Sequence, residues 1–266
     1  MLRVPAGPFT MGTDHGGEED EHPAHTVTLP AFWLDRTEVT NAAYASCVAA
    51  KACGHNASHL ASSRHGDGTV TATPKEVTDE DFARPQQPVT GVTWDNARDY
   101  CAWRSARLPR EAEFEKAARG TDDRHFTWGN DAPTTSLTAY GRTGGDGAPD
   151  DVATHPSGRG PYGHDDLGGN VWEWMADEYD PAAYTRAGAA QGQPGSCPEI
   201  LKTLDDLRAH HKQGFTGSNP IPTTCEHVLR GGAYNYGGAG LRCTNRVHHP
   251  GHFRLLVAGF RCAKDG

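Results

Sequence analysis

Glycine and proline occur so often in this chain that long regular elements are excluded. Its 266 residues include 32 glycines and 18 prolines, and only 36% of the residues are hydrophobic. Glycine loses much conformational freedom on folding, and proline cannot donate a backbone hydrogen bond. The composition therefore indicates many turns and comparatively little regular structure. Such a fold gains stability from crosslinks, and disulfide bonds among the seven cysteines are candidates for them.

From composition alone, the cysteines have two interpretations. Each disulfide bond would stabilise a loop-rich fold by about 2–4 kcal/mol, chiefly by restricting the unfolded chain. Alternatively, all seven are reduced and buried in a cytosolic protein, because free cysteine packs as a small hydrophobic residue. Spacing suggests two local pairs: Cys47 with Cys53, six residues apart, and Cys197 with Cys225, which flank an apolar segment.

The charge and hydropathy of the chain exclude several classes of partner. A net charge of -9 and a pI near 5.9 leave no basic stripe, so we expect no nucleic-acid partner. No apolar run approaches the roughly 20 residues that a membrane helix needs, and residues 1–5 lack the apolar stretch of a signal peptide. We therefore expect a soluble chain without membrane insertion and without a signal peptide.

Three helices are predicted from caps and apolar periodicity. Thr40 and Thr93 are suitable N-caps, and apolar residues recur at helical spacing after each of them. Pro109 suits the first turn of a third helix, which ends at Arg119 and Gly120.

The remaining segments are predicted as short strands and loops. Residues 25–29 and 31–34 have the alternation and flanking proline typical of strands. Residues 54–88 are polar and predict a surface loop, and residues 129–161 predict an ordered loop rich in glycine, aspartate and proline.

The chain is predicted to form one domain over residues 1–266, because no repeat or break in composition divides it. Residues 187–226 are expected to be an inserted segment with its own short amphipathic helix. The apolar face of that helix consists of Ile200, Leu201, Leu204 and Leu207.

Six motifs in sequence suggest a family. They are VPAGPFTMG (residues 4–12), EVTN (38–41), PVTGVTWDNA (88–97), RLPREAEFE (107–115), GNVWEW (169–174), and RGGAY, RCTNR and GFRC within residues 230–262. Their order and spacing resemble those of the formylglycine-generating enzyme, or sulfatase-modifying factor, family. The resemblance spans essentially the whole chain. It implies an α+β, C-type-lectin-like fold, low in regular secondary structure, with small twisted antiparallel sheets and a few helices.

The resemblance also bears on the cysteines. It implies a disulfide bond between Cys101 and Cys262, whereas the family's partner for Cys243 would lie near Ala118, which cannot form one. Three bridges and one leftover thiol are therefore expected: Cys101–Cys262, Cys47–Cys53, Cys197–Cys225 and free Cys243. This pattern favours an extracytoplasmic location, periplasmic or secreted. Cys243 is either a buried inert thiol or a reactive or metal-binding one.

The family's copper-binding cysteines are missing from this chain. Family members that oxidise a substrate cysteine hold copper with two cysteines, five residues apart, just after the motif that matches residues 230–234. The corresponding stretch here, residues 235–241, contains no cysteine, and Ala233 replaces a serine. Because Cu(I) prefers sulfur ligands, we expect no formylglycine-generating activity.

Two functions are compatible with this loss. The first is a diverged, non-catalytic module that binds a peptide, a protein or a small molecule through its C-terminal segment, residues 230–262. Its predicted ligand-binding residues are Tyr234, Asn235, Tyr236, Arg242, His248, His249, His252 and Phe253. The alternative is an oxygen-dependent oxidoreductase acting on a thiol or amino acid with copper or iron, for which Cys243, His248 and His249 are candidate catalytic residues.

Four arginines of the C-terminal segment, including Arg242, also have a structural interpretation. Arg230, Arg242, Arg246 and Arg261 recur along it. In a fold poor in regular structure, guanidinium groups commonly satisfy loop carbonyls and carboxylates.

The segment around the GNVWEW motif has the composition of a calcium site. Ca²⁺ takes six to eight oxygen ligands, and glycines let backbone carbonyls turn toward one point. The resemblance places ligands at Asp166, Gly169, Val171 and Glu173. The alternative is a turn stabilised by Asp and Asn side chains, in which Glu173 pairs with an arginine.

Overall fold

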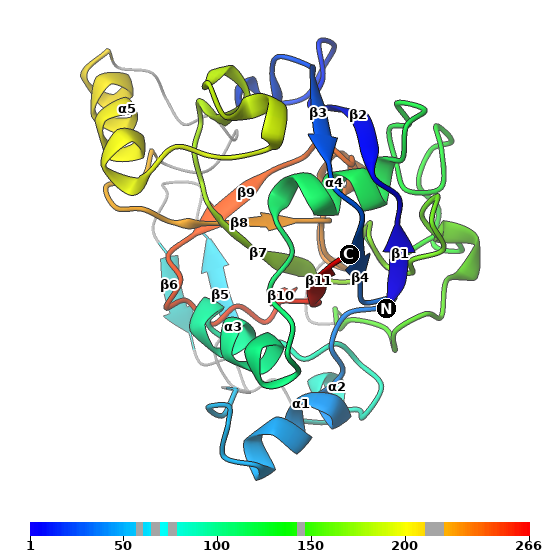
Figure 1. The fold of residues 1–266 in the computed structure, drawn as a ribbon. Helices are drawn as coiled ribbons and strands as arrows, with labels where there is room; N and C mark the ends of the chain where they lie inside the picture. The colour runs from blue at the N-terminus through cyan, green and yellow to red at the C-terminus, as the bar shows by residue number, and fades with distance from the viewer. Residues whose placement is uncertain (57–60, 65–69, 74–78, 143–146, 211–220) are drawn as a thin grey trace.

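The structure is a computed structural model and describes residues 1–56, 61–64, 70–73, 79–142, 147–210 and 221–266. The described residues form an α+β arrangement of small sheets and short helices, as the sequence predicts (Figure 1). None of the helices in this part combines the length and apolar character that a bilayer crossing requires.

The largest sheet has four strands in the order β10-β7-β8-β9. Its strands are β10 (Ala258–Gly259), β7 (Trp172–Glu178), β8 (His227–Arg230) and β9 (Val247–His249). The pairs β7–β8 and β8–β9 are antiparallel, but β10 runs parallel to β7. The expected antiparallel pairing thus holds for the longer strands of this sheet, and the two-residue strand β10 adds a parallel edge.

A three-stranded antiparallel sheet joins the two ends of the chain. Its strands are β1 (Leu2–Val4), β4 (Phe32–Leu34) and β11 (Ala263–Asp265), with β4 in the middle. The two termini therefore lie near each other (Figure 1). Beside this sheet, β2 (Gly7–Met11) pairs with β3 (His25–Leu29), which matches the strand predicted at residues 25–29.

The predicted helices form, and their caps explain where they begin. They are α1 (Asn41–Ala49), α3 (Trp94–Trp103), α4 (Glu111–Arg119) and α5 (Cys197–Ala209). The Thr40 hydroxyl accepts a hydrogen bond from the Ala43 amide, and the Thr93 hydroxyl accepts one from the Asn96 amide. The predicted position of Pro109 in the first turn is wrong. The helix α4 begins after its N-cap Arg110, so the proline precedes the cap. Single 3-10 turns are η1 (Glu19–Glu21), η3 (Pro156–Gly158), η4 (Ala183–Thr185), η5 (Ala189–Gln191) and η6 (Gly238–Leu241).

Residues 54–88 are not entirely the loop that the sequence predicts. The antiparallel strands β5 (Ala61–Arg64) and β6 (Val70–Thr73) are followed by α2 (Asp79–Phe82). These elements are short and lack a strong apolar period, so their backbone pairing leaves no clear sequence pattern. Residues 57–60, 65–69 and 74–78 of this segment lie outside the described residues.

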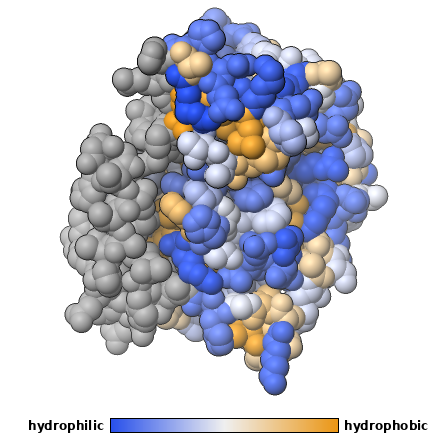
Figure 2. All heavy atoms as spheres, turned by 90° about the vertical axis from the view of Figure 1, so that its left-hand side faces the viewer, coloured by the Kyte–Doolittle hydropathy of each residue, from blue (hydrophilic) through white to orange (hydrophobic). Residues whose placement is uncertain are grey.

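The core consists of two buried clusters. Trp172 and Trp174 of β7 are buried in the second of them, which confirms that these residues form core rather than a ligand platform. Cys243 and Ala118 both belong to the first cluster. On the face shown in Figure 2, apolar residues form separate small areas among hydrophilic ones.

Candidate functional site

The three expected disulfide bonds are present. They join Cys47 to Cys53, Cys101 to Cys262, and Cys197 to Cys225. The bond implied by the family resemblance therefore ties α3 to the C-terminal segment. The remaining cysteine, Cys243, is free and buried.

Cys243 has the environment of an inert thiol. Burial, together with the nearby charge of Glu115, raises the pKa of the Cys243 thiol to about 12. A nucleophilic or metal-binding cysteine needs the thiolate, which lower pKa values favour. At neutral pH Cys243 is therefore a buried thiol, and of the two interpretations of this residue the structure favours the inert one.

The arginines of the C-terminal segment bind other parts of the chain, as expected. Arg230 donates to the carbonyls of Thr244 and Asn245, each at 2.8 Å. Arg246 donates to both carboxylate oxygens of Glu111, at 2.6 and 2.9 Å.

Arg242, one of the predicted ligand-binding residues, is engaged in the same way. It donates to the Glu21 carboxylate at 2.5 Å and to the Ala239 carbonyl at 2.7 Å. The structure thus gives this guanidinium partners within the chain.

The histidines of the predicted surface do not converge. His248 is buried, its Nδ1 lies 2.6 Å from Oε2 of Glu226, and its ring stacks on Tyr179. Successive side chains of a strand point to opposite faces, so His249 projects away from His248. His249 and His252 instead contact the ring of Phe253. His248 is thus an interior residue and cannot belong to an exposed recognition surface.

The tyrosines of the C-terminal segment have different surroundings. Tyr234 is buried and packs edge-on against Phe82, with ring centroids 6.1 Å apart. Tyr236 is 39% exposed and packs edge-on against Trp172 at 5.2 Å. Asn235 between them is exposed. The eight predicted residues therefore do not form one concave surface.

In the predicted calcium loop, Glu173 has an arginine partner. Both of its oxygens accept hydrogen bonds from Arg261, each at 2.7 Å, and both side chains are fully buried. Asp166 Oδ2 accepts a hydrogen bond from the Ala153 amide. The side-chain amide of Asn170 donates to Glu38, as expected for a turn held by side-chain hydrogen bonds.

The same region nevertheless holds three buried carboxyl groups around one guanidinium. Burial raises the pKa values of Glu38, Asp166 and Glu173, and all three carboxyl groups interact with the single guanidinium of Arg261. Glu38 Oε2 is buried and lacks a hydrogen-bond partner among the described residues. It lies 4.0 Å from Nη2 of Arg261, an ion pair without a hydrogen bond, which leaves Glu38 and Asp166 more available than Glu173 to a bound cation. Calcium binding here stays a prediction.

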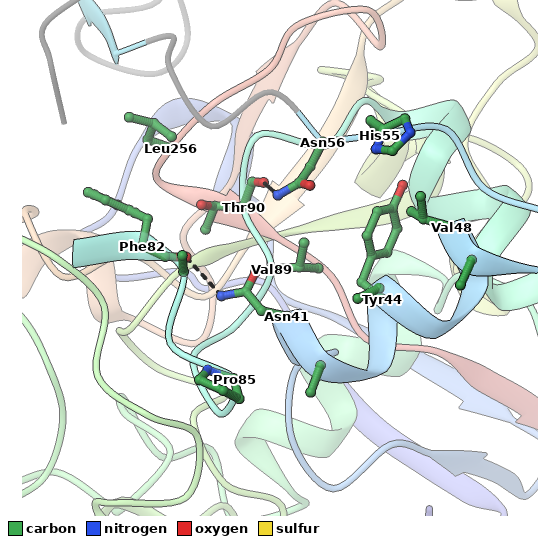
Figure 3. Close-up of a pocket in the computed structure, with 14 residues that line it drawn as sticks. Asn41, Tyr44, Val48, His55, Asn56, Phe82, Pro85, Val89, Thr90 and Leu256 are labelled. Atoms are coloured by element: carbon green, nitrogen blue, oxygen red, sulfur yellow. Dashed lines mark hydrogen bonds between the residues drawn. The ribbon is translucent and has the colours of Figure 1, made fainter. Parts of the chain in front are cut away.

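A cavity of about 780 Å³ lies between α1, residues 82–90 and the C-terminal segment (Figure 3). Its described lining residues are Asn41, Ala42, Tyr44, Ala45, Val48, Ala49, His55, Asn56, Phe82, Ala83, Pro85, Val89, Thr90 and Leu256. Most of these side chains are apolar, and none of those described carries a full charge when histidine is neutral. The cavity is thus a candidate ligand site.

Hydrogen bonds hold the wall of the cavity. The Asn41 side-chain amide donates to the carbonyl of Phe82 at 2.8 Å, and the Asn56 amide donates to the Thr90 carbonyl at 3.2 Å. The Tyr44 hydroxyl donates to the Gly54 carbonyl at 2.7 Å. Two of these bonds connect α1 with residues 54 and 82, and the third connects residues 56 and 90.

Sequence analysis did not predict this cavity, and none of its described lining residues is among the predicted ligand-binding residues. Leu256 belongs to the C-terminal segment, and Phe82 of the lining packs edge-on against Tyr234. The lining comes from segments about 200 residues apart in the sequence, so no local motif marks it.

Comparison with known proteins shows to which family the chain belongs. A family model described as sulfatase-modifying factor enzyme 1-like domain matches residues 1–266. The chain belongs to the sulfatase-modifying factor family. The formylglycine-generating enzyme of Streptomyces coelicolor is 33% identical over 317 residues, which cover 100% of this chain and 89% of that protein.

Two further similarities show how varied this family is. The hercynine oxygenase of Mycolicibacterium smegmatis is 33% identical, over 98% of this chain but only 60% of its own length. The structure of PvdO from Pseudomonas aeruginosa matches with a TM-score of 0.67 and 26% identity, covering 99% of this chain and 93% of PvdO. The sulfatase-modifying factor fold predicted from the motifs is thereby confirmed.

Proposed function

We propose that this family member binds a small, uncharged ligand in the cavity between α1, residues 82–90 and Leu256, and does not generate formylglycine. The observation that carries the proposal is the cavity itself. Its volume of about 780 Å³ falls within the range of small-molecule sites, which are mostly apolar and preformed.

The chemistry of the lining suggests the kind of ligand. Val48, Phe82 and Leu256 offer apolar contacts, while Thr90 and Asn56 offer polar atoms for orientation. A charged ligand would lose its hydration here without meeting an opposite charge on any described lining residue, which is costly. A largely apolar molecule with one or two neutral hydrogen-bonding groups fits best.

The thiols argue against formylglycine generation. Residues 235–241 contain no cysteine, and the one free thiol of the chain, Cys243, is buried with a raised pKa. Residues 235–241 therefore do not supply the pair of sulfur ligands that holds copper at this position in the family.

We propose further that the chain folds in an extracytoplasmic, oxidising compartment and binds calcium near Asp166. Three disulfide bonds support the first statement. The carboxylate oxygen of Glu38 that lacks a hydrogen-bond partner among the described residues supports the second.

An oxidoreductase remains the second candidate function, and the similarity to a hercynine oxygenase favours it. Metal analysis separates the two candidates. Stoichiometric iron or copper in the purified chain, lost on replacing His249, would support the oxidoreductase. Calcium as the only bound metal would support the ligand-binding module.

The cavity is tested with the uncharged fluorescent probe N-phenyl-1-naphthylamine. We expect its fluorescence to rise on binding the wild-type chain and the rise to disappear in Ala45→Trp, because Ala45 lines the cavity. Ala102→Trp is the matched control, since Ala102 is an exposed alanine of α3 away from the cavity. Equal fluorescence in both variants would contradict the proposal.

A further inference from the structure

Three potential metal ligands meet at the base of α5. One oxygen of Glu178 and the sulfurs of Cys197 and Cys225 all lie within 4.8 Å of one another. Among the described residues this is the one group of three such donors. The two sulfurs are joined in a disulfide bond, so neither is a thiolate ligand in this state.

The group is assembled from three separate elements. Glu178 ends β7 and pairs in register with His227 at the start of β8. Cys225 precedes that strand by two residues, and Cys197 is the first residue of α5. The β7–β8 ladder therefore fixes two of the donors, and the disulfide bond brings the third to them.

This disulfide bond differs from the others in accessibility. Cys101 and Cys262 are completely buried, and Cys47 and Cys53 are also buried, whereas Cys197 and Cys225 are both partly exposed. Cys197 also lies in the first turn of a 13-residue helix. The partial positive charge at a helix N-terminus stabilises a thiolate, so Cys197 suits both reduction and metal binding.

We propose that reduction of Cys197–Cys225 creates a zinc site formed by the two thiolates and the Glu178 carboxylate, with water as the fourth ligand. A small-molecule dithiol supplies two electrons and two protons, its own sulfurs become a disulfide, and the protein S–S bond becomes two thiols. Binding of Zn²⁺ then releases the two thiol protons. The disulfide bond and the zinc site exclude each other.

The geometry permits this exchange without movement of the backbone. Tetrahedral zinc with Zn–S bonds of about 2.3 Å places two sulfurs about 3.8 Å apart. The Cα atoms of Cys197 and Cys225 are 5.9 Å apart, which allows that separation by rotation of the side chains. Two thiolates and a carboxylate are a donor set that Zn²⁺ accepts. Zinc would then hold α5 to the β7–β8 ladder in place of the covalent bond.

The test compares the oxidised chain with a chain reduced by a dithiol until peptide mapping shows two new thiols, at positions 197 and 225. We expect one Zn²⁺ per reduced chain by isothermal titration calorimetry and none for the oxidised chain. Cd²⁺ should give a thiolate charge-transfer band in the reduced chain only. Equal zinc binding by both forms, or none by the reduced form, would overturn the proposal.

Variants identify the ligands. Glu178→Gln leaves the disulfide bond intact and should weaken zinc binding by at least about tenfold, the loss that even an indirect ligand partner causes. Cys197→Ser with Cys225→Ser should abolish binding. Cys47→Ser with Cys53→Ser is the matched control and should bind zinc as the wild-type chain does. That pair has no third donor nearby among the described residues. Unchanged affinity in Glu178→Gln would show that the carboxylate is not a ligand.

Discussion

Arg261 donates one hydrogen bond of 2.7 Å to each carboxylate oxygen of Glu173, and neither side chain is exposed. Removing one partner of a buried pair leaves the other charge uncompensated, which costs about 3–5 kcal/mol. We therefore expect Arg261→Met to lower the free energy of unfolding by this amount in urea denaturation. Lys202→Ala is the control, because its ion pair with Asp206 is exposed and is worth less than about 1 kcal/mol. A similar loss in both variants would contradict this interpretation.

Asp177 is expected to make stability depend on pH. Burial, and then the charge of Glu111, raises its pKa from 3.8 to about 7. The folded chain therefore binds a proton that the unfolded chain has lost between about pH 4 and pH 7, so the stability contributed by this group falls as pH rises through that range.

Asp177→Asn removes this titration while keeping an oxygen to accept the hydrogen bond from the Glu111 amide. Relative to wild type, the variant should be more stable at pH 8 than at pH 5, by up to about 3 kcal/mol, because the pKa of Asp177 lies about two units above pH 5 and each unit corresponds to about 1.4 kcal/mol. Chemical denaturation at the two pH values measures the difference. A stability difference between variant and wild type that stays constant with pH would argue against the raised pKa.

Thiol counting tests the cysteine assignment. Because Cys243 is buried with a pKa of about 12, the folded chain should show no thiol that reacts rapidly with Ellman's reagent at pH 8. Unfolding without reductant should expose one thiol per chain. A count of seven would mean that the three disulfide bonds do not form.

Calcium is expected to raise the melting temperature of the wild-type chain, and EGTA to lower it. Three buried carboxyl groups, Glu38, Asp166 and Glu173, share the one guanidinium of Arg261, and a cation near Asp166 would supply a second positive charge. Each kcal/mol gained should raise the melting temperature by about 2–4 °C. Asp166→Asn should abolish the response, which differential scanning calorimetry measures. Identical melting in calcium and in EGTA would refute a site in this loop.

Local signals in the sequence predicted the helices and the crosslinks. Thr40 and Thr93 cap α1 and α3 because their hydroxyl groups satisfy amides of the first turn, an interaction that depends only on neighbouring residues. The pairing of Cys101 with Cys262, separated by 161 residues, depended on the family resemblance.

The strands and the cavity required long-range information. β10 has two residues and forms a strand because Ala258 and Gly259 pair with residues 172 and 173 of β7. His248 is a predicted ligand-binding residue that is buried, and its burial could not be predicted because it depends on Tyr179 and Glu226 from other segments. The cavity likewise depends on the packing of α1 near Leu256, which no periodic pattern in the sequence indicates.

The position of β4 between β1 and β11 has a consequence for synthesis of the chain. β4 is translated early, yet one of its two edges stays unpaired until residues 263–265 have left the ribosome. An unpaired strand edge invites association with other chains. A nascent polypeptide halted before residue 263 should therefore need a chaperone to remain free of aggregation.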